Sequence, residues 1–175
     1  GRVVVRLVRE MAARRDRALA DWIAAQVAFP SSMVDRIVPA ATDATRAGAA
    51  AALGAADALA VETEPFLQWV IEDHFPRGRP AWEEAGAIFV QDVAPYEKMK
   101  LRMLNGAHTL TAHLGILHGL DCVRDVMALP ALAAQVRAHM EAAAATLDAV
   151  PGIDLAAYQG DLLARFANPA IAHRN

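Results

Sequence analysis

Residues 96–110 read YEKMKLRMLNGAHTL, and this stretch decides how the rest of the chain is interpreted. We predict that it forms a helix. At about 100° per residue, Asn105 lies about 140° around that helix from Lys100, and His108 lies between them. Three side chains with chemical roles therefore share one broad face within a few turns.

Without further context, the same three residues also suit an ordinary helix. A Lys on a helix is usually a solvated charge, and an Asn in mid-helix is usually a surface residue. A single His such as His108 beside apolar neighbours is more often a core or surface residue than a catalytic one. The spacing alone leaves both interpretations open.

The composition favours a mainly α, multi-helical fold with a few short strands. The chain has 175 residues and is rich in Ala, which is the best helix former. The net charge of −3 does not indicate a basic surface for binding nucleic acid or a membrane surface. The single Cys122 cannot form an internal disulfide, which suits a reducing compartment. We therefore expect a cytoplasmic protein with no nucleic-acid or membrane partner.

Caps and breakers predict the order of the elements. A long amphipathic helix should run from Arg2 to Val27, followed by a short extended segment at MVDRIVP. The other predicted elements are a helix begun by Thr42 or Asp43 and ended by Gly54, an ambiguous segment over 61–75, a helical turn opened by Pro80, a strand at 87–90, the central helix closed by Gly119, a short helix capped by Asp121, a longer helix from 130 to about 150, and a last helix capped by Asp154.

Four further blocks stand beside the central motif: FPSSMVDRI at 29–37, EPFLQWVIED at 64–73, RPAWE at 79–83 and RFANPAI at 165–171. Together with the Lys-x4-Asn-x2-His spacing, their order resembles the mannitol dehydrogenase family of polyol-specific, long-chain dehydrogenases. The resemblance covers nearly the whole chain. Several long matches in one order are more specific than any short motif.

The resemblance implies a chemistry for the central motif. Lys100 would be the general base that takes the hydroxyl proton, and burial or a neighbouring cation would have to lower its pKa. Asn105 would donate a hydrogen bond to the developing alkoxide without adding charge. His108 would orient the substrate. NAD, with NADP as an alternative, would accept the hydride.

Two acidic residues carry both a functional and a structural interpretation. Asp35 resembles the family's substrate-contacting Asp, although a buried Asp paired with Arg36 or a backbone amide fits the sequence equally well. Glu97 lies one turn before Lys100 and would tune it or relay its proton, or else form a surface ion pair of little energetic value. Candidates for the rim of the site are Arg165, Asn168 and His173.

No phosphate-binding turn for a dinucleotide is present. Such a turn needs glycines at Gly-x-Gly-x-x-Gly spacing between a strand and a helix, and no two of the ten glycines stand two apart. We therefore expect residues 1–175 to form a single domain, the C-terminal substrate domain, without the N-terminal Rossmann domain that precedes it in the family. This piece alone should lack activity.

We expect no metal site. His108, His113 and His118 share the central helix, but steps of five residues turn about 140° each, so the three side chains fan around it. The i, i+4 pairing of helical zinc sites is missing.

The sequence thus predicts the C-terminal domain of an oxidoreductase that converts a secondary alcohol of a mannitol-like polyol to a ketose with NAD. Its partners would be a small-molecule substrate and its own Rossmann domain. One alternative is a sugar-acid oxidoreductase of the fructuronate or mannonate type, which should need an Arg or Lys clamp for the substrate carboxylate. The other is a non-catalytic helical binding or dimerisation module.

Overall fold

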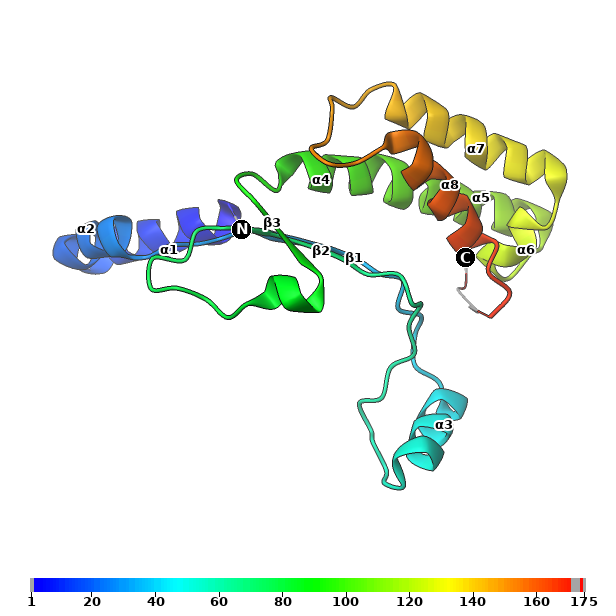
Figure 1. The fold of residues 1–175 in the computed structure, drawn as a ribbon, viewed down its shortest axis with the longest axis horizontal. Coiled ribbons are helices and arrows are strands. Elements are labelled where there is room, and N and C mark those ends of the chain that lie inside the picture. The colour runs from blue at the N-terminus through cyan, green and yellow to red at the C-terminus, as the bar shows by residue number, and fades with distance from the viewer. Residues whose placement is uncertain (1, 171–173, 175) are drawn as a thin grey trace. The chain divides into compact units, whose positions relative to one another are not determined.

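The computed structural model describes residues 2–170 and 174 (Figure 1). The chain divides into two compact units, which are described separately: the first is Gly1–Val34 with Gln68–Ala94, and the second is Asp35–Leu67 with Pro95–Asn175. Within the described residues, every helix is too short or too polar to cross a bilayer.

The first unit begins with a pair of helices. α1 (Arg2–Arg15) and α2 (Arg17–Gln26) pack on each other, so the prediction of one helix from Arg2 to Val27 is wrong. The break is at Asp16, whose backbone is extended and whose carboxylate accepts hydrogen bonds from the amides of Ala18 and Leu19. An Asp that caps the helix after it competes with continuation of the helix before it.

A three-stranded sheet follows in the order β1-β2-β3. The strands are β1 (Ser32–Asp35), β2 (Gln68–Glu72) and β3 (Ala87–Val90), and β2 pairs with β3 in parallel. The 3-10 helix η1 (Trp82–Ala85) precedes β3. Its Trp82 ring contacts Trp69, Phe75 and Phe89. Aromatic packing therefore holds the parallel pair together.

The second unit opens with helix α3 (Asp43–Leu53), which follows the sequence signals. Thr42 and Thr45 form a reciprocal capping box, and Gly54 adopts a left-handed conformation (φ 69°) that ends the helix. A left-handed residue at this position is most often Gly because it has no Cβ.

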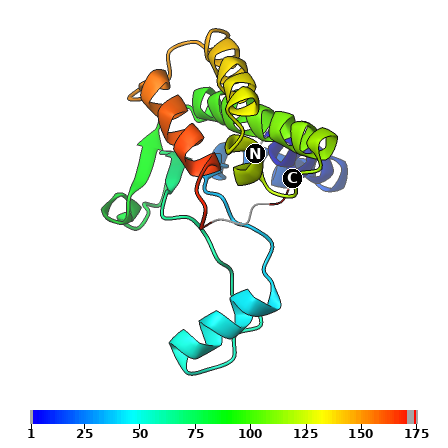
Figure 2. The same cartoon turned by 90° about the vertical axis from the view of Figure 1, so that its right-hand side faces the viewer.

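The remaining helices form the main body of the second unit (Figures 1 and 2). They are α4 (Ala94–Met99), the π-helix η2 (Lys100–Asn105), α5 (Gly106–His118), α6 (Val123–Met127), α7 (Pro130–Ala144) and α8 (Leu155–Phe166). α4, η2 and α5 continue one another, and α7 packs along η2 and α5. The Tyr96 hydroxyl fixes α4 by donating to the Pro151 carbonyl at 2.7 Å.

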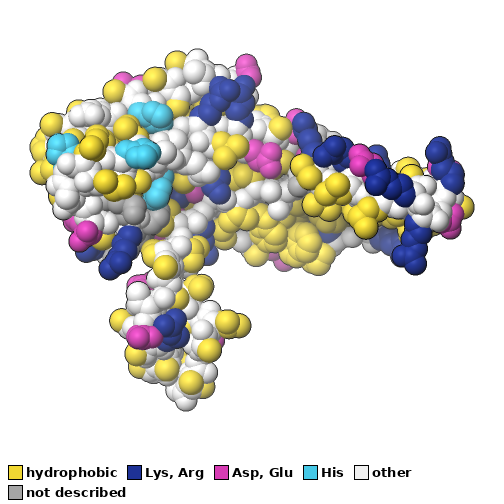
Figure 3. Space-filling view, turned by 180° about the vertical axis from the view of Figure 1, so that it is seen from behind, with side chains coloured by type: hydrophobic (Ala, Val, Ile, Leu, Met, Phe, Trp, Pro, Cys, Tyr) yellow, Lys and Arg dark blue, Asp and Glu magenta, His cyan; other side chains and the backbone are white. Residues whose placement is uncertain are grey.

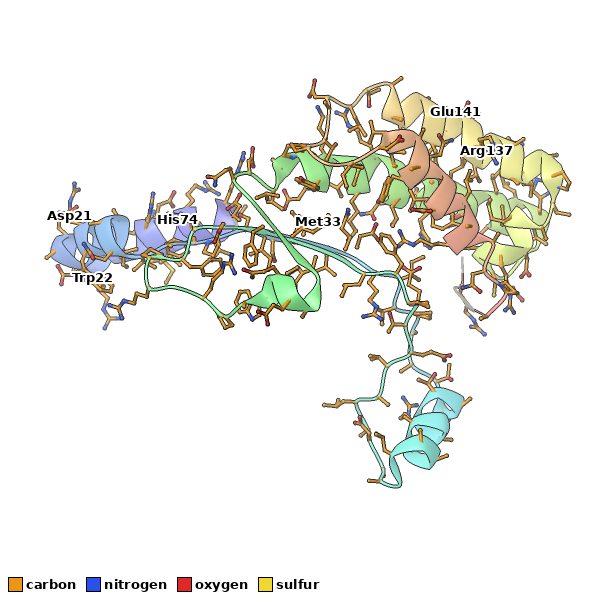
Figure 4. All side chains as sticks on the ribbon, viewed as in Figure 1. Asp21, Trp22, Met33, His74, Arg137 and Glu141 are labelled. Carbon is orange, nitrogen blue, oxygen red and sulfur yellow. The ribbon has the colours of Figure 1, made fainter. Side chains whose placement is uncertain are left out.

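The core of this unit is made of long, flexible and branched apolar side chains. α7 turns one stripe inward and exposes the opposite side, where Arg137 and Glu141 project (Figure 4). The largest fully buried apolar side chains of this unit are Met99, Met103, Val123, Val126, Val136, Met140 and Leu162. The prediction of a mainly α fold with a few short strands is confirmed.

Helix ends were predicted with mixed success. Gly119 (φ 67°) closes α5 and Asp154 caps α8, as expected. α6 is capped by Cys122 with Asp125 in a capping box, so the prediction of Asp121 as the cap is wrong by one residue. α7 ends at Ala144 and not near Val150, because the chain turns there.

Gly106 marks a close approach between α5 and α7. A Cβ at this position would lie 2.8 Å from Nε2 of His139, which is closer than side chains pack. That Nε2 atom is buried and has no hydrogen-bond partner among the described residues. The contact sits directly after the π-helix, so it fixes the spacing between η2 and α7.

We predict that Gly106→Ala lowers or fails to raise the free energy of unfolding, because His139 must move to admit the methyl group. In a His139→Ala background the same change should stabilise by up to about 1 kcal/mol, since Ala is the better helix residue. Urea unfolding of the four proteins tests this. Gly160→Ala, in open space on α8, is the matched control and should stabilise in both backgrounds. Identical behaviour of Gly106→Ala and Gly160→Ala would contradict the prediction.

Candidate active site

A pocket of about 350 Å³ lies within the second unit. One wall is the chain that leaves β1, and the other is the helical segment made of η2 and the start of α5. The lining residues are Asp35, Arg36, Ile37, Val38, Lys100, Leu104, Asn105, His108 and Thr109. The structure therefore brings together four of the residues that the sequence singled out, namely Asp35, Lys100, Asn105 and His108.

The π-helix changes how Lys100 and Asn105 face each other. Lys100–Asn105 is π-helical, and the amide of Gly106 donates to the carbonyl of Leu101 five residues earlier. A π-helix needs more residues for each turn than an α-helix. A step of five residues therefore returns closer to its starting direction than the 140° expected for an α-helix. Lys100 and Asn105 therefore face more nearly the same way than the sequence predicted.

His108 follows in α5, three residues after Asn105, which is about 60° around an α-helix. Its ring stands edge-on to the Phe166 ring, with centroids 6.3 Å apart. Burial lowers the pKa of His108 below its usual value. The imidazole is therefore neutral at pH 7, with one nitrogen as donor and the other as acceptor.

The Asp35 carboxylate is fully buried at the base of the β1 wall. It accepts hydrogen bonds from the Tyr158 hydroxyl at 2.8 Å and from Nη1 and Nη2 of Arg165 at 3.1 and 2.7 Å. Burial and the Asp35 charge raise the pKa of Tyr158, so its hydroxyl stays protonated and donates. Asp35 thus lines the pocket and is also buried and paired, but the expected pairing with Arg36 or a backbone amide is wrong, because its partners are Tyr158 and a buried cation.

That cation is Arg165, which also binds Glu64. Burial opposes its charged form, but hydrogen bonds from the guanidinium to Asp35 and Glu64 hold the pKa of Arg165 above its usual value. The prediction of Arg165 at the rim of the site is wrong, because its side chain is only 8% exposed. Glu64 and Tyr158 were not singled out from the sequence. The signal available for Glu64 was its position at the start of the EPFLQWVIED block.

The other candidates lie outside the pocket. Glu97 is exposed on α4 and is not a lining residue. Arg102, two residues after Lys100, donates to the carbonyl and hydroxyl of Thr146. The side chain of Asn168 accepts a hydrogen bond from the amide of Ala170. His173 lies outside the described residues.

Histidines gather on one surface of the second unit (Figure 3). Even so, the part of the chain that the structure describes holds no group of three or more His, Cys, Asp or Glu that could bind a metal ion.

Comparison with known proteins first matches this chain to two domain models of one family. Residues 1–84 match the family model of the mannitol dehydrogenase Rossmann domain, and residues 92–175 match that of the mannitol dehydrogenase C-terminal domain. The chain belongs to the mannitol dehydrogenase family. The resemblance found in the sequence is confirmed, whereas the prediction of a single domain over 1–175 stays a prediction.

Relatives with assigned names include two kinds of oxidoreductase. The chain is 49% identical over 175 residues to D-mannonate oxidoreductase from Escherichia coli, covering 99% of this chain and 36% of that protein. It is 41% identical over 175 residues to mannitol 2-dehydrogenase from Aspergillus terreus, covering 98% of this chain and 35% of that protein. The chain thus spans little more than a third of the length of these relatives.

Solved structures show the same fold. A ternary complex of Pseudomonas fluorescens mannitol 2-dehydrogenase with NAD and D-mannitol matches with a TM-score of 0.87 and 44% identity, over 99% of this chain and 36% of that one. A substrate-free D-sorbitol dehydrogenase matches with a TM-score of 0.84 and 37% identity, over 93% of this chain and 34% of that one.

The lowered pKa of His108 predicts a pH-dependent stability. Below pH 6.5 the unfolded chain gains a proton at this residue more readily than the folded chain, so stability falls as the pH falls. His108→Gln should remove that component, which is a fraction of the ~1.4 kcal/mol per pH unit that one proton can contribute. Urea unfolding between pH 8 and 5 measures it.

His113→Gln, at an exposed position of the same helix, controls for the loss of an imidazole from α5. Parallel loss of stability below pH 6.5 in wild type and His108→Gln would show that burial of His108 does not contribute.

Proposed function

We propose that this chain is the substrate-facing part of a dehydrogenase that oxidises a secondary alcohol of a polyol to a ketone. The observation that carries the proposal is that Lys100, Asn105 and His108 all line the same pocket. These three side chains supply a base, a neutral donor and a neutral imidazole on one face. Family membership and the mannitol named in the P. fluorescens complex support the substrate class.

Lys100 is the proposed general base. Alcohol oxidation releases a proton from the hydroxyl and a hydride from the carbon, and a C=O double bond forms between them. A neutral Lys amine takes the proton. Lys100 is partly buried and lines the pocket.

Asn105 and His108 have supporting roles in this proposal. The Asn105 amide donates to the oxygen as negative charge develops on it, which lowers the barrier more than it strengthens substrate binding. His108, kept neutral by burial, binds a neighbouring hydroxyl of the substrate without adding charge. Asp35 belongs to the wall that the polyol contacts. Glu97, exposed one turn before Lys100, would pass the proton between Lys100 and solvent.

The proposed hydride acceptor is NAD, with NADP as the alternative. The chain lacks a Gly-x-Gly-x-x-Gly turn, so its own residues do not provide the usual cradle for the pyrophosphate. We therefore propose that the cofactor is held mainly by residues of the enzyme's Rossmann domain outside this chain. Residues 1–175 would then act as the substrate domain of a longer enzyme.

A sugar acid is the second candidate substrate. It is favoured by the 49% identity to D-mannonate oxidoreductase, against 41% to the A. terreus mannitol 2-dehydrogenase. The intact enzyme should be assayed against polyols and sugar acids with both NAD and NADP. No turnover of either class would favour the third candidate, a non-catalytic helical module.

In the intact enzyme, Lys100→Ala should lower turnover by about 10²–10⁴-fold, the usual share of general base catalysis. Wild-type alcohol oxidation should rise with pH until the base is fully deprotonated, and carbonyl reduction should show the reverse. A steady-state pH profile in both directions tests this. Lys98→Ala is the matched control, since Lys98 pairs with Asp148 at 3.0 Å and does not line the pocket. Equal effects of the two substitutions would place the base elsewhere.

Residues 1–175 alone should neither bind NAD at millimolar concentration nor oxidise polyols, because the phosphate-binding turn is missing. Titration calorimetry on this piece, with the intact enzyme as positive control, measures the binding. Saturable binding by the piece would overturn this expectation and show that the residues described here suffice to hold the cofactor.

A further inference from the structure

The guanidinium of Arg165 joins two buried carboxylates. It donates to Glu64 through Nε at 2.9 Å and Nη2 at 2.7 Å, and to Asp35 through Nη1 at 3.1 Å and Nη2 at 2.7 Å. Each carboxylate is thus bound by two parallel hydrogen bonds. The flat face of the same group lies 4.0 Å over the ring of Phe66. Few other side chains could satisfy this geometry, because a Lys has neither the fork nor the flat face.

Asp35 and Glu64 connect the guanidinium to three successive residues of the pocket wall. Asp35 is itself the first of them. The carbonyl of Glu64 accepts from Nε of Arg36 at 3.0 Å, and its carboxylate accepts from the amide of Ile37 at 2.6 Å. All three wall residues line the pocket that also holds Lys100. Movement of the guanidinium would therefore move the wall that faces the proposed base.

We propose that Arg165 is a positioning residue for the dehydrogenase reaction: through Asp35 and Glu64 it holds residues 35–37 in place opposite Lys100. This inference rests on the proposed function. It goes beyond that function by giving a role to three groups outside the Lys-Asn-His motif, namely Arg165, Glu64 and Tyr158. It also explains why a buried Asp35 is tolerated in the wall, since the guanidinium and the Tyr158 hydroxyl satisfy its oxygens.

The test is a double-mutant cycle in the intact enzyme. Arg165→Met should lower kcat/KM for polyol oxidation by about 100-fold, because small misplacements of a positioned wall have effects of that size. In an Asp35→Asn background the same change should produce a smaller loss than in the wild type, because the connection through Asp35 is already broken and only the one through Glu64 remains. Arg165→Lys should behave like Arg165→Met despite its charge.

Losses that multiply independently in the cycle would overturn the inference, as would full activity of Arg165→Lys. Activities are compared per folded molecule, with folding followed by circular dichroism. Leu162→Ala is the matched control for lost stability, since Leu162 is fully buried on the same helix and makes no polar contact. It should lower stability and leave kcat/KM unchanged. An equal fall in kcat/KM for this control would reduce Arg165 to a purely structural role.

Tyr158→Phe keeps the test decisive if Arg165→Met does not fold. It removes only the hydroxyl that donates to Asp35 and exposes no unpaired cation. A several-fold loss of kcat/KM that disappears in the Asp35→Asn background supports the inference, and an equal loss in both backgrounds overturns it. The proposed function fails separately: it falls if Lys100→Ala remains active, whatever the result of these cycles.

Discussion

The structure of the second unit depends on one buried guanidinium group, that of Arg165. Arg165 lies in α8, the last helix. Asp35 lies before the segment that contains α3, and Glu64 lies after it. Folding buries two carboxylates and one guanidinium together. Their burial is tolerated because nearly all of their hydrogen-bonding positions are filled. Removing the guanidinium would leave two buried carboxylates without a cation. The pocket wall, the base of α3 and the position of α8 thus depend on the same set of bonds.

The opposite wall depends on a different constraint, which is backbone geometry. The segment from Lys100 to Asn105 is π-helical, and π-helices occur mostly as short insertions within α-helices, often at functional sites. Here the wider turn brings Lys100 and Asn105 toward the same direction. The close contact of Gly106 with His139 holds the end of that turn against α7. In a regular α-helix of the same sequence, Lys100 and Asn105 would point in directions about 140° apart.

The sequence predicted much of the fold and part of the site. Thr42, Gly54, Gly119 and Asp154 act through local hydrogen bonds or backbone conformations, so their roles could be recognised from the residues themselves. The π-turn could not be predicted, since its residues suit an α-helix equally well. The pairing of Arg165 with Asp35 joins residues 130 positions apart, and no local pattern records such a contact. Asp16 was misjudged because Asp is tolerated within exposed helices as well as at caps.

The same separation of 130 residues has a consequence for the order in which the protein is made. At roughly 5–20 residues per second, the ribosome delivers Asp35 on the order of ten seconds before Arg165. During that interval Asp35 and Glu64 lack their guanidinium partner, and the wall lacks the bonds that pass through Arg165. The pocket is therefore completed late in synthesis, when α8 emerges and docks. A nascent chain stalled before residue 165 would carry the entire Lys-Asn-His motif and still lack a finished pocket.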